Sequence, residues 1–175
     1  SSDGTELAVV SDWPVDGSLW IADVAAGGSR RVAGLGGTEN GELRADSVAW
    51  SPDGGRVAVA GVGDSHFGFR IFETAGWKAL HEEDNRFAFP CALAVDPAGE
   101  RVAMTTLIGQ AAIHDLKSGK RTASLATTGL RAAGHVCSVL EWSGDGQAIL
   151  VEGLRLANGL RPVPYKPSRV STAAP

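Results

Sequence analysis

Apolar residues in this chain fall in short runs of strand length, and most runs adjoin a turn of similar composition. Such runs, bounded by turn residues, are typical of β-strands covered on both faces. Proline presets φ for these turns, and glycine accepts the positive φ that they need. Four turns share this pattern: Ser1-Ser2-Asp3-Gly4, Ser51-Pro52-Asp53-Gly54, Asp96-Pro97-Ala98-Gly99 and Ser143-Gly144-Asp145-Gly146. Their last glycines are 50, 45 and 47 residues apart, so the pattern is an internal repeat.

Each repeat predicts four strands. A strand precedes the turn at 47–50, 92–95 and 139–142, and another follows it at 6–10, 56–60, 101–104 and 148–151. A third strand is expected within 20–27, 70–76 and 112–119, and a weaker fourth around 31–33, 78–80 and 122–125. Four strands in about 45 residues form a propeller blade. The sequence therefore predicts an all-β fold, a β-propeller of four-stranded antiparallel blades.

Several segments resemble WD-repeat propellers. Residues 47–54, Ser-Val-Ala-Trp-Ser-Pro-Asp-Gly, look like the first strand and turn of that family's blade. Residues 113–119 are similar to its third strand, with His114-Asp115 where a Trp-Asp pair usually stands, and Gly134-His135 resembles its Gly-His element. The resemblance covers roughly residues 1–155 and implies a propeller. Because no repeat keeps the Trp-Asp pair, we expect degenerate blades held mainly by apolar packing.

The predicted propeller segment spans residues 1–160, with repeats near 1–46, 47–90, 91–135 and 136–160. This amounts to about three and a half blades, with one more marginal strand expected within 154–164. Residues 161–175 contain several prolines and are expected to form a tail or linker. Since propellers have four to eight blades, we expect either a longer parent chain, a second copy of this chain or a partner chain to complete the ring.

Composition and charge exclude several classes of protein. Hydrophobic residues make up 43% and charged residues 21% of the chain, which excludes wholesale disorder. A net charge of −4 without a basic stripe argues against nucleic-acid binding. The apolar runs are too short to span a membrane. Cys91 and Cys137 are too few for a disulfide scaffold and are expected to be buried thiols. The compartment is left open, with the cytoplasm favoured.

Candidate catalytic and metal motifs are weak. Residues 63–68 bring Asp64, Ser65 and His66 together, but they lack the spacing and the strand-to-helix turn of a nucleophile elbow. Residues 81–84, His-Glu-Glu-Asp, are not a zinc motif and are expected to form a solvated loop face. His114 is expected to be a core histidine. No catalytic residue, cofactor or metal is predicted. Trp50 and Trp142 hold equivalent positions and are expected to pack in the core.

The strongest binding candidates fall in the connections between strands two and three and between blades. In a propeller these connections share one face. Large aromatic residues and arginine on exposed loops are typical binding anchors; ordinary packing between neighbouring loops is the alternative. The predicted partner-binding residues on this loop face are Trp13, Asp16, Asp64, His66, Phe67, Arg86 and Phe87.

Three functions are compatible with this pattern. The first is a non-catalytic scaffold or recognition module that binds a protein or peptide on the loop face. The second is a sensor or regulatory propeller of a larger signalling or defence protein. A propeller hydrolase or lyase is less favoured, because the first strands supply one acid, Glu141, toward the axis. Fold alone does not decide among these functions.

Overall fold

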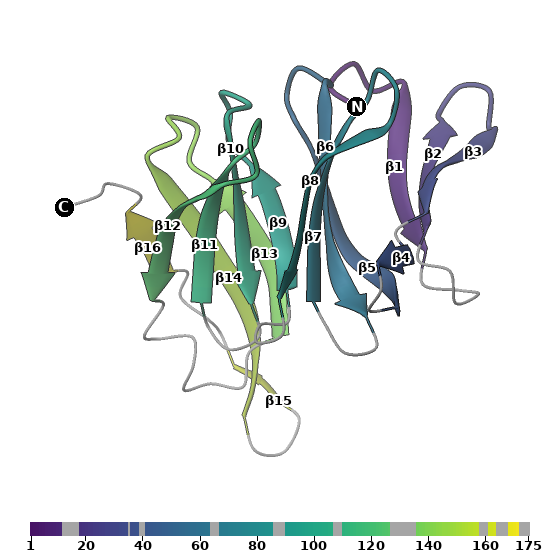
Figure 1. Cartoon of the computed structure of the whole chain (residues 1–175). Coiled ribbons are helices and arrows are strands. Elements are labelled where there is room, and N and C mark those ends of the chain that lie inside the picture. Colours follow the sequence, from purple (N-terminus) through teal and green to yellow (C-terminus); the bar gives the residue numbers. More distant parts are fainter. Residues whose placement is uncertain are drawn as a thin grey trace.

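The structure is a computed structural model that describes residues 1–11, 18–34, 36–38, 41–63, 67–85, 90–106, 110–126, 136–157, 161–163 and 168–171. The described residues form strands and turns only, grouped in four antiparallel sheets (Figure 1). No helix in this part of the chain could cross a membrane. The prediction of an all-β fold is confirmed.

The four sheets follow one another along the chain. Sheet one contains β1 (Glu6–Ser11), β2 (Ser18–Asp23) and β3 (Ser29–Gly34); sheet two contains β4 (Gly36–Thr38), β5 (Gly41–Trp50), β6 (Arg56–Gly63), β7 (Phe67–Glu73) and β8 (Lys78–Asn85). Sheet three contains β9 (Pro90–Val95), β10 (Arg101–Thr106), β11 (Gln110–Asp115) and β12 (Arg121–Ala126). Sheet four contains β13 (Val136–Trp142), β14 (Ala148–Ala157), β15 (Arg161–Val163) and β16 (Ser168–Ser171). Within sheets one to three, neighbouring strands in space are neighbours in sequence.

The pairing registers repeat from sheet to sheet. The last residue of the first strand pairs with the same position of the second strand in each case: Trp50 with Val57, Val95 with Val102, and Trp142 with Ile149. Successive hairpins therefore place equivalent residues at equivalent depths, as expected for propeller blades. Sheet one begins at the second strand of this pattern, since β1 pairs with β2 as β6 does with β7.

The turn between the first two strands is built by a serine and an aspartate. The Oδ1 atom of Asp53 accepts hydrogen bonds from the Ser51 hydroxyl and the Gly55 amide, and Ser51 Oγ accepts from the Arg56 amide. Gly54 has a φ of 71°, which glycine adopts without steric cost. The repeated turn residues are therefore a local structural device.

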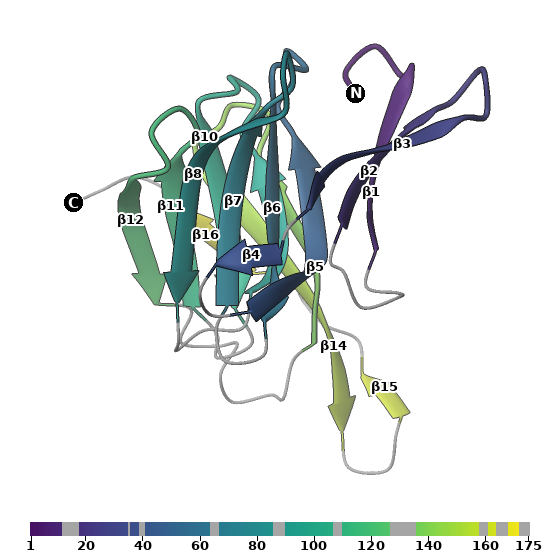
Figure 2. The same cartoon turned by 45° about the vertical axis from the view of Figure 1, so that its right-hand side comes forward.

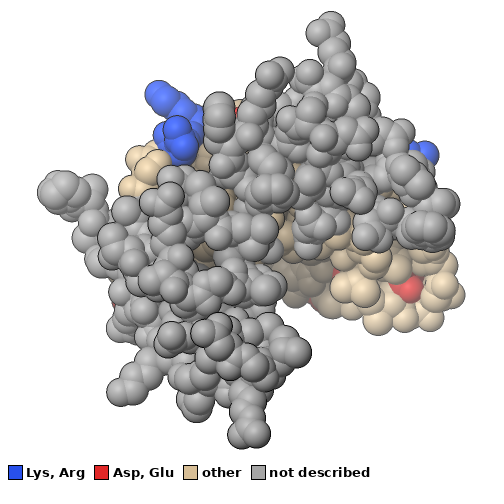
Figure 3. Space-filling model, turned by 90° about the horizontal axis from the view of Figure 1, so that it is seen from below, with Lys and Arg blue, Asp and Glu red and all other residues tan. Residues whose placement is uncertain are grey.

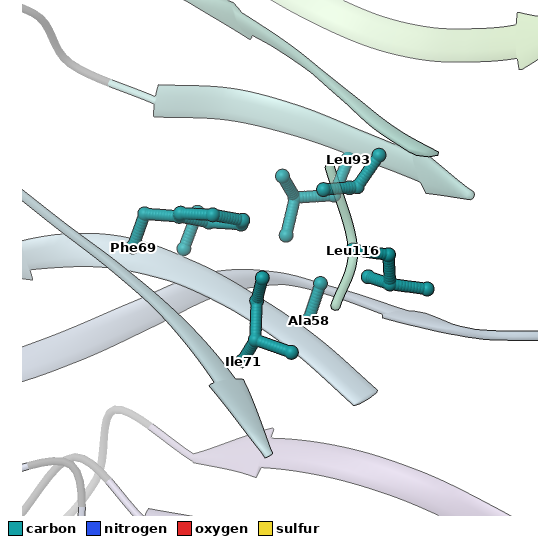
Figure 4. Packing of buried hydrophobic residues seen from close by; sticks show 7 residues of the cluster. Ala58, Phe69, Ile71, Leu93 and Leu116 are labelled. Carbon is teal, nitrogen blue, oxygen red and sulfur yellow. The ribbon is translucent and has the colours of Figure 1, made fainter. Parts of the chain in front are cut away.

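The hydrophobic core is divided among the three interfaces between successive sheets. One cluster joins sheets one and two, a second joins sheets two and three, and a third joins sheets three and four. Figure 4 shows the second cluster, in which Phe69 and Ile71 of sheet two face Leu93 and Leu116 of sheet three. The sheets thus stack side by side, with sheet one at one edge of the stack (Figure 2).

Three details differ from the sequence expectation. Trp50 and Trp142 are half-buried and pack against the edges of their clusters, so they lie outside the fully buried core. The His81–Asp84 segment, expected to be a loop, belongs to strand β8 because its backbone pairs with β7. Strand β16 falls within the expected linker and pairs with β14 as a third strand.

Candidate functional site

The predicted loop-face residues flank strand ends that share one end of the sheets. The strands that end at Ser11, Gly63 and Asn85 all lead into these connections at the lower end in Figure 1, opposite the repeated turns. Viewed from this end, the described Lys and Arg atoms that are visible lie at the margin of the molecule (Figure 3). The described ends of these strands therefore lie at one end of the sheets.

The structure does not test where the predicted loop-face side chains lie. Trp13, Asp16, Asp64, His66, Arg86 and Phe87 lie outside the described residues. Phe67 begins β7, where its backbone pairs with Val62 and Asn85, and its side chain is not described. Cys91 and Cys137 lie on β9 and β13, the first strands of sheets three and four, and their thiols are likewise not described.

A pocket opens at the opposite end of the molecule, between the turns of sheets one and two. Its volume is about 280 Å³. The strands place the first turn of sheet one against that of sheet two, and the turn joining β7 to β8 forms a further wall. The lining residues are Ser1, Ser2, Asp3, Thr5, Glu6, Arg30, Trp50, Asp53, Gly54, Thr74, Ala75 and Trp77. We call this the turn-face pocket.

Two aspartates of the turn-face pocket are held ionised by their own turns. Hydrogen bonds from the Ser1 hydroxyl and from the amide and hydroxyl of Thr5 lower the pKa of Asp3 to about 2. Hydrogen bonds from Ser51 and Gly55 lower the pKa of Asp53. Both residues use Oδ1 for these bonds, and Oδ2 accepts none from the described residues. Each aspartate therefore keeps one anionic oxygen available to a ligand.

The other charges at this pocket are partly compensated. The Arg30 guanidinium donates to Glu6 Oε1 at 2.9 Å, and both side chains are partly exposed. The amino group of Ser1 donates to the carbonyl oxygen of Glu6. The side chains lining the pocket thus carry three carboxylates and one guanidinium, and the charge of Arg56 adds to the lowering of the pKa of Asp53.

Two tryptophans form the aromatic part of the pocket. The rings of Trp50 and Trp77 meet edge to face, with centroids 6.1 Å apart and planes at 83°. Trp77 has a φ of 54°, at the turn position where Gly27 and Gly119 have φ values of 68° and 71°. A bulky residue in this conformation is unusual and costs free energy. The sequence signal that could have identified the pocket is this tryptophan at a turn position that elsewhere holds glycine.

A histidine cluster lies between sheets two and three. The His114 side chain is 1% exposed, and its Nδ1 atom lies 3.0 Å from the Gly119 carbonyl oxygen and 3.9 Å from Glu83 Oε2. Its ring is 5.0 Å from that of Phe69, and the His81 ring lies at 6.0 Å from the same phenylalanine. Burial lowers the pKa of His114. In the part of the chain that the structure describes, no group of three His, Cys, Asp or Glu residues could hold a metal.

Comparison with known proteins supports the fold. No family model and no curated protein matches the chain. Many chains of solved structures match, including one from the crystal structure of a mitotic checkpoint complex. That match has a TM-score of 0.64 at 16% identity and covers 83% of this chain. The chain spans 41% of the length of the matched chain. The fold is therefore that of β-propeller blades.

Proposed function

We propose that this protein is a non-catalytic propeller module that binds other proteins. The observation that carries the proposal is the stack of blade-like sheets in which β1, β6 and β8 end at the same end. Loops on such an end, held by a rigid scaffold, are where binding residues usually lie. The similar chain comes from the structure of a complex, which agrees with such a role. The partner is a protein or a peptide.

The loop face is the proposed main contact surface. Trp13, Phe67 and Phe87 supply aromatic anchors, and Arg86 supplies a guanidinium; aromatic residues and arginine are enriched in protein interfaces. Asp16, Asp64 and His66 supply polar contacts on the same face. The described histidines support the non-catalytic reading, because His81 and His114 pack between sheets, where His114 is inaccessible to a substrate.

The test compares two faces of the same protein. The chain is used to capture proteins from an extract of its source, in parallel with a Trp13→Ala/Phe87→Ala variant and a control variant carrying Val24→Ser on the exposed turn of sheet one. We expect the loop-face variant to lose a captured protein that the control retains. Equal capture by all three proteins, or capture by none, would contradict the proposal.

A further inference from the structure

Sheets three and four contain a site that the chain fills with its own cation. The guanidinium carbon of Arg101 lies 4.7 Å from the centroid of the Trp142 ring. Arg101 also donates from Nε to Asp96 Oδ2 at 2.8 Å and from Nη2 to the carbonyl oxygen of Gly146 at 2.9 Å. An arginine of one sheet is thereby held between the tryptophan of the next sheet, a carboxylate and a turn carbonyl.

The same positions in sheets one and two hold a different pair. Trp50 ends β5 as Trp142 ends β13, and these strands hold the first position of the repeated pattern. Glu6 begins β1 as Arg101 begins β10, and these strands hold the second position. Glu6 and Trp50 both line the turn-face pocket. Replacement of the arginine by a glutamate therefore leaves a cavity beside the tryptophan, bordered by negative charge.

We propose that the turn-face pocket binds an arginine side chain of a partner protein. This inference rests on the proposed function, because the arginine comes from the protein partner. The bound guanidinium takes the place that Arg101 takes on Trp142: it stacks against Trp50 or Trp77 and donates to the available oxygens of Asp3 and Asp53. Guanidinium suits both contacts, because it is planar, stacks on aromatic rings and pairs with carboxylates through several N–H groups.

No arginine or lysine side chain of the described residues lies over Trp50 in the turn-face pocket. Arg30 is engaged by Glu6 at the rim, with 54% of its side chain exposed. Among the described residues, the Trp50 ring contacts Trp77 and has no cation over it. The pocket of about 280 Å³ is large enough for a guanidinium group and its adjoining methylenes. At neutral pH both aspartates are ionised and arginine is charged, since hydrogen bonds lower the pKa of Asp3 and Asp53.

The direct test uses a short peptide as the probe. The ¹⁵N-labelled chain is titrated with acetyl-Gly-Arg-Gly-amide, and the indole N–H signals of Trp50 and Trp77 are followed by NMR. We expect saturable chemical-shift changes at both signals, with a dissociation constant in the millimolar range. Binding should weaken as the salt concentration is raised, because salt screens the charges. The same peptide with citrulline, which has the shape of arginine without its charge, should shift neither signal. Equal shifts with both peptides, or none with either, would overturn the inference.

Three variants separate this site from a structural effect. Glu6→Arg supplies the guanidinium within the chain, as Arg101 does, and should abolish peptide binding. Trp77→Gly removes one wall and should weaken binding at least about fivefold, while folding is kept because two other repeats have glycine there. Asp53→Asn should also weaken binding, whereas Asp145→Asn, the same turn position in sheet four, is the matched control. Folded Glu6→Arg protein that binds like the wild type would overturn the inference.

The two proposals fail in different ways. If the extract experiment captures a partner through the loop face but the arginine peptide does not bind, the pocket inference is wrong and the proposed function stands. If the peptide binds as described while no loop-face capture occurs, the pocket inference stands and the loop-face function is wrong.

Discussion

Equivalent residues of the repeats carry different chemistry in this protein. Trp50 and Trp142 hold the same position, but only the Trp142 indole N–H has a hydrogen bond, 2.9 Å to the carbonyl oxygen of Ala94. The Trp50 indole N–H is buried and has no partner among the described residues. A hydrogen-bonded polar group stabilises the fold, whereas a buried one without a partner costs free energy. The two repeats therefore share a tryptophan at this position but differ in the hydrogen bonding of its indole N–H.

This difference predicts unequal effects of the same substitution. Trp142→Phe removes an indole hydrogen bond and replaces the indole over which Arg101 lies by a smaller ring, and we expect it to cost about 1 kcal/mol more than Trp50→Phe. Urea unfolding of the two variants measures the difference in the free energy of unfolding. Equal losses would mean that the Ala94 bond contributes nothing.

His114 predicts a pH dependence of stability. Burial lowers its pKa, and the Gly119 carbonyl and Glu83 oppose that shift, while Arg121 and His81 add to it. Between this lowered value and the ordinary value of about 6.5, the unfolded chain holds the proton and the folded chain does not. The free energy of unfolding therefore falls as pH falls through this window. Compared with His114→Phe, the wild type should lose more stability between about pH 7 and pH 5; parallel curves would contradict this.

At the scale of elements, the turns that join β2 to β3, β7 to β8 and β11 to β12 have the same geometry but different neighbours. In sheet three, Gly119 lies against the imidazole of His81, so that a Cβ atom at Gly119 would overlap the ring. In sheet one, Gly27 has the same positive φ and open space around it. In sheet two, Trp77 takes this conformation and forms a wall of the turn-face pocket. One turn geometry thus serves packing, simple reversal and a candidate binding site.

The two glycines give a matched pair of substitutions. Gly27→Ala should cost about 1 kcal/mol, from the positive φ alone. Gly119→Ala should cost clearly more, because the imidazole of His81 must move as well. Thermal unfolding compares the two variants at equal concentration. A Gly119→Ala variant as stable as Gly27→Ala would show that His81 has room to move.

At the scale of the molecule, the sheets are joined by apolar clusters and by a few polar ties. Arg101 links sheet three to sheet four and pairs with Asp96, whose side chain is fully buried. The Arg30–Glu6 pair, by contrast, lies at the surface of sheet one. Ion pairs at the surface contribute little, whereas a buried carboxylate that loses its partner is costly.

We therefore expect the two arginines to differ in their effect on stability. Arg101→Met should lower the free energy of unfolding by about 2 kcal/mol or more, since it leaves Asp96 buried with backbone amides as its remaining donors. Arg30→Met should change it by less than about 0.5 kcal/mol. Denaturant unfolding tests both, and a mild Arg101→Met would show that the tie between the sheets is unimportant.

The sequence by itself determined the blades. Alternation of apolar runs with turns that end in glycine is a local pattern, and the hydrogen bonds that build each turn lie within five residues, so the strands and hairpins could be predicted. The predicted loop-face residues rest on the same pattern, and their side chains stay untested. The segment 168–171 could not be assigned from the sequence, because its pairing with β14 depends on the edge that a distant strand offers.

Only the tertiary structure decided the turn-face pocket. Asp3, Trp50 and Trp77 are far apart in sequence and meet because sheet one stacks on sheet two. The difference between Glu6 and Arg101 also has meaning only once each is placed beside the tryptophan of the next sheet. Hydrophobic periodicity specifies which residues face another sheet, but side-chain size and charge across that contact decide whether the space is filled or left open. The fold was therefore encoded locally, while the candidate site arose from contacts between blades.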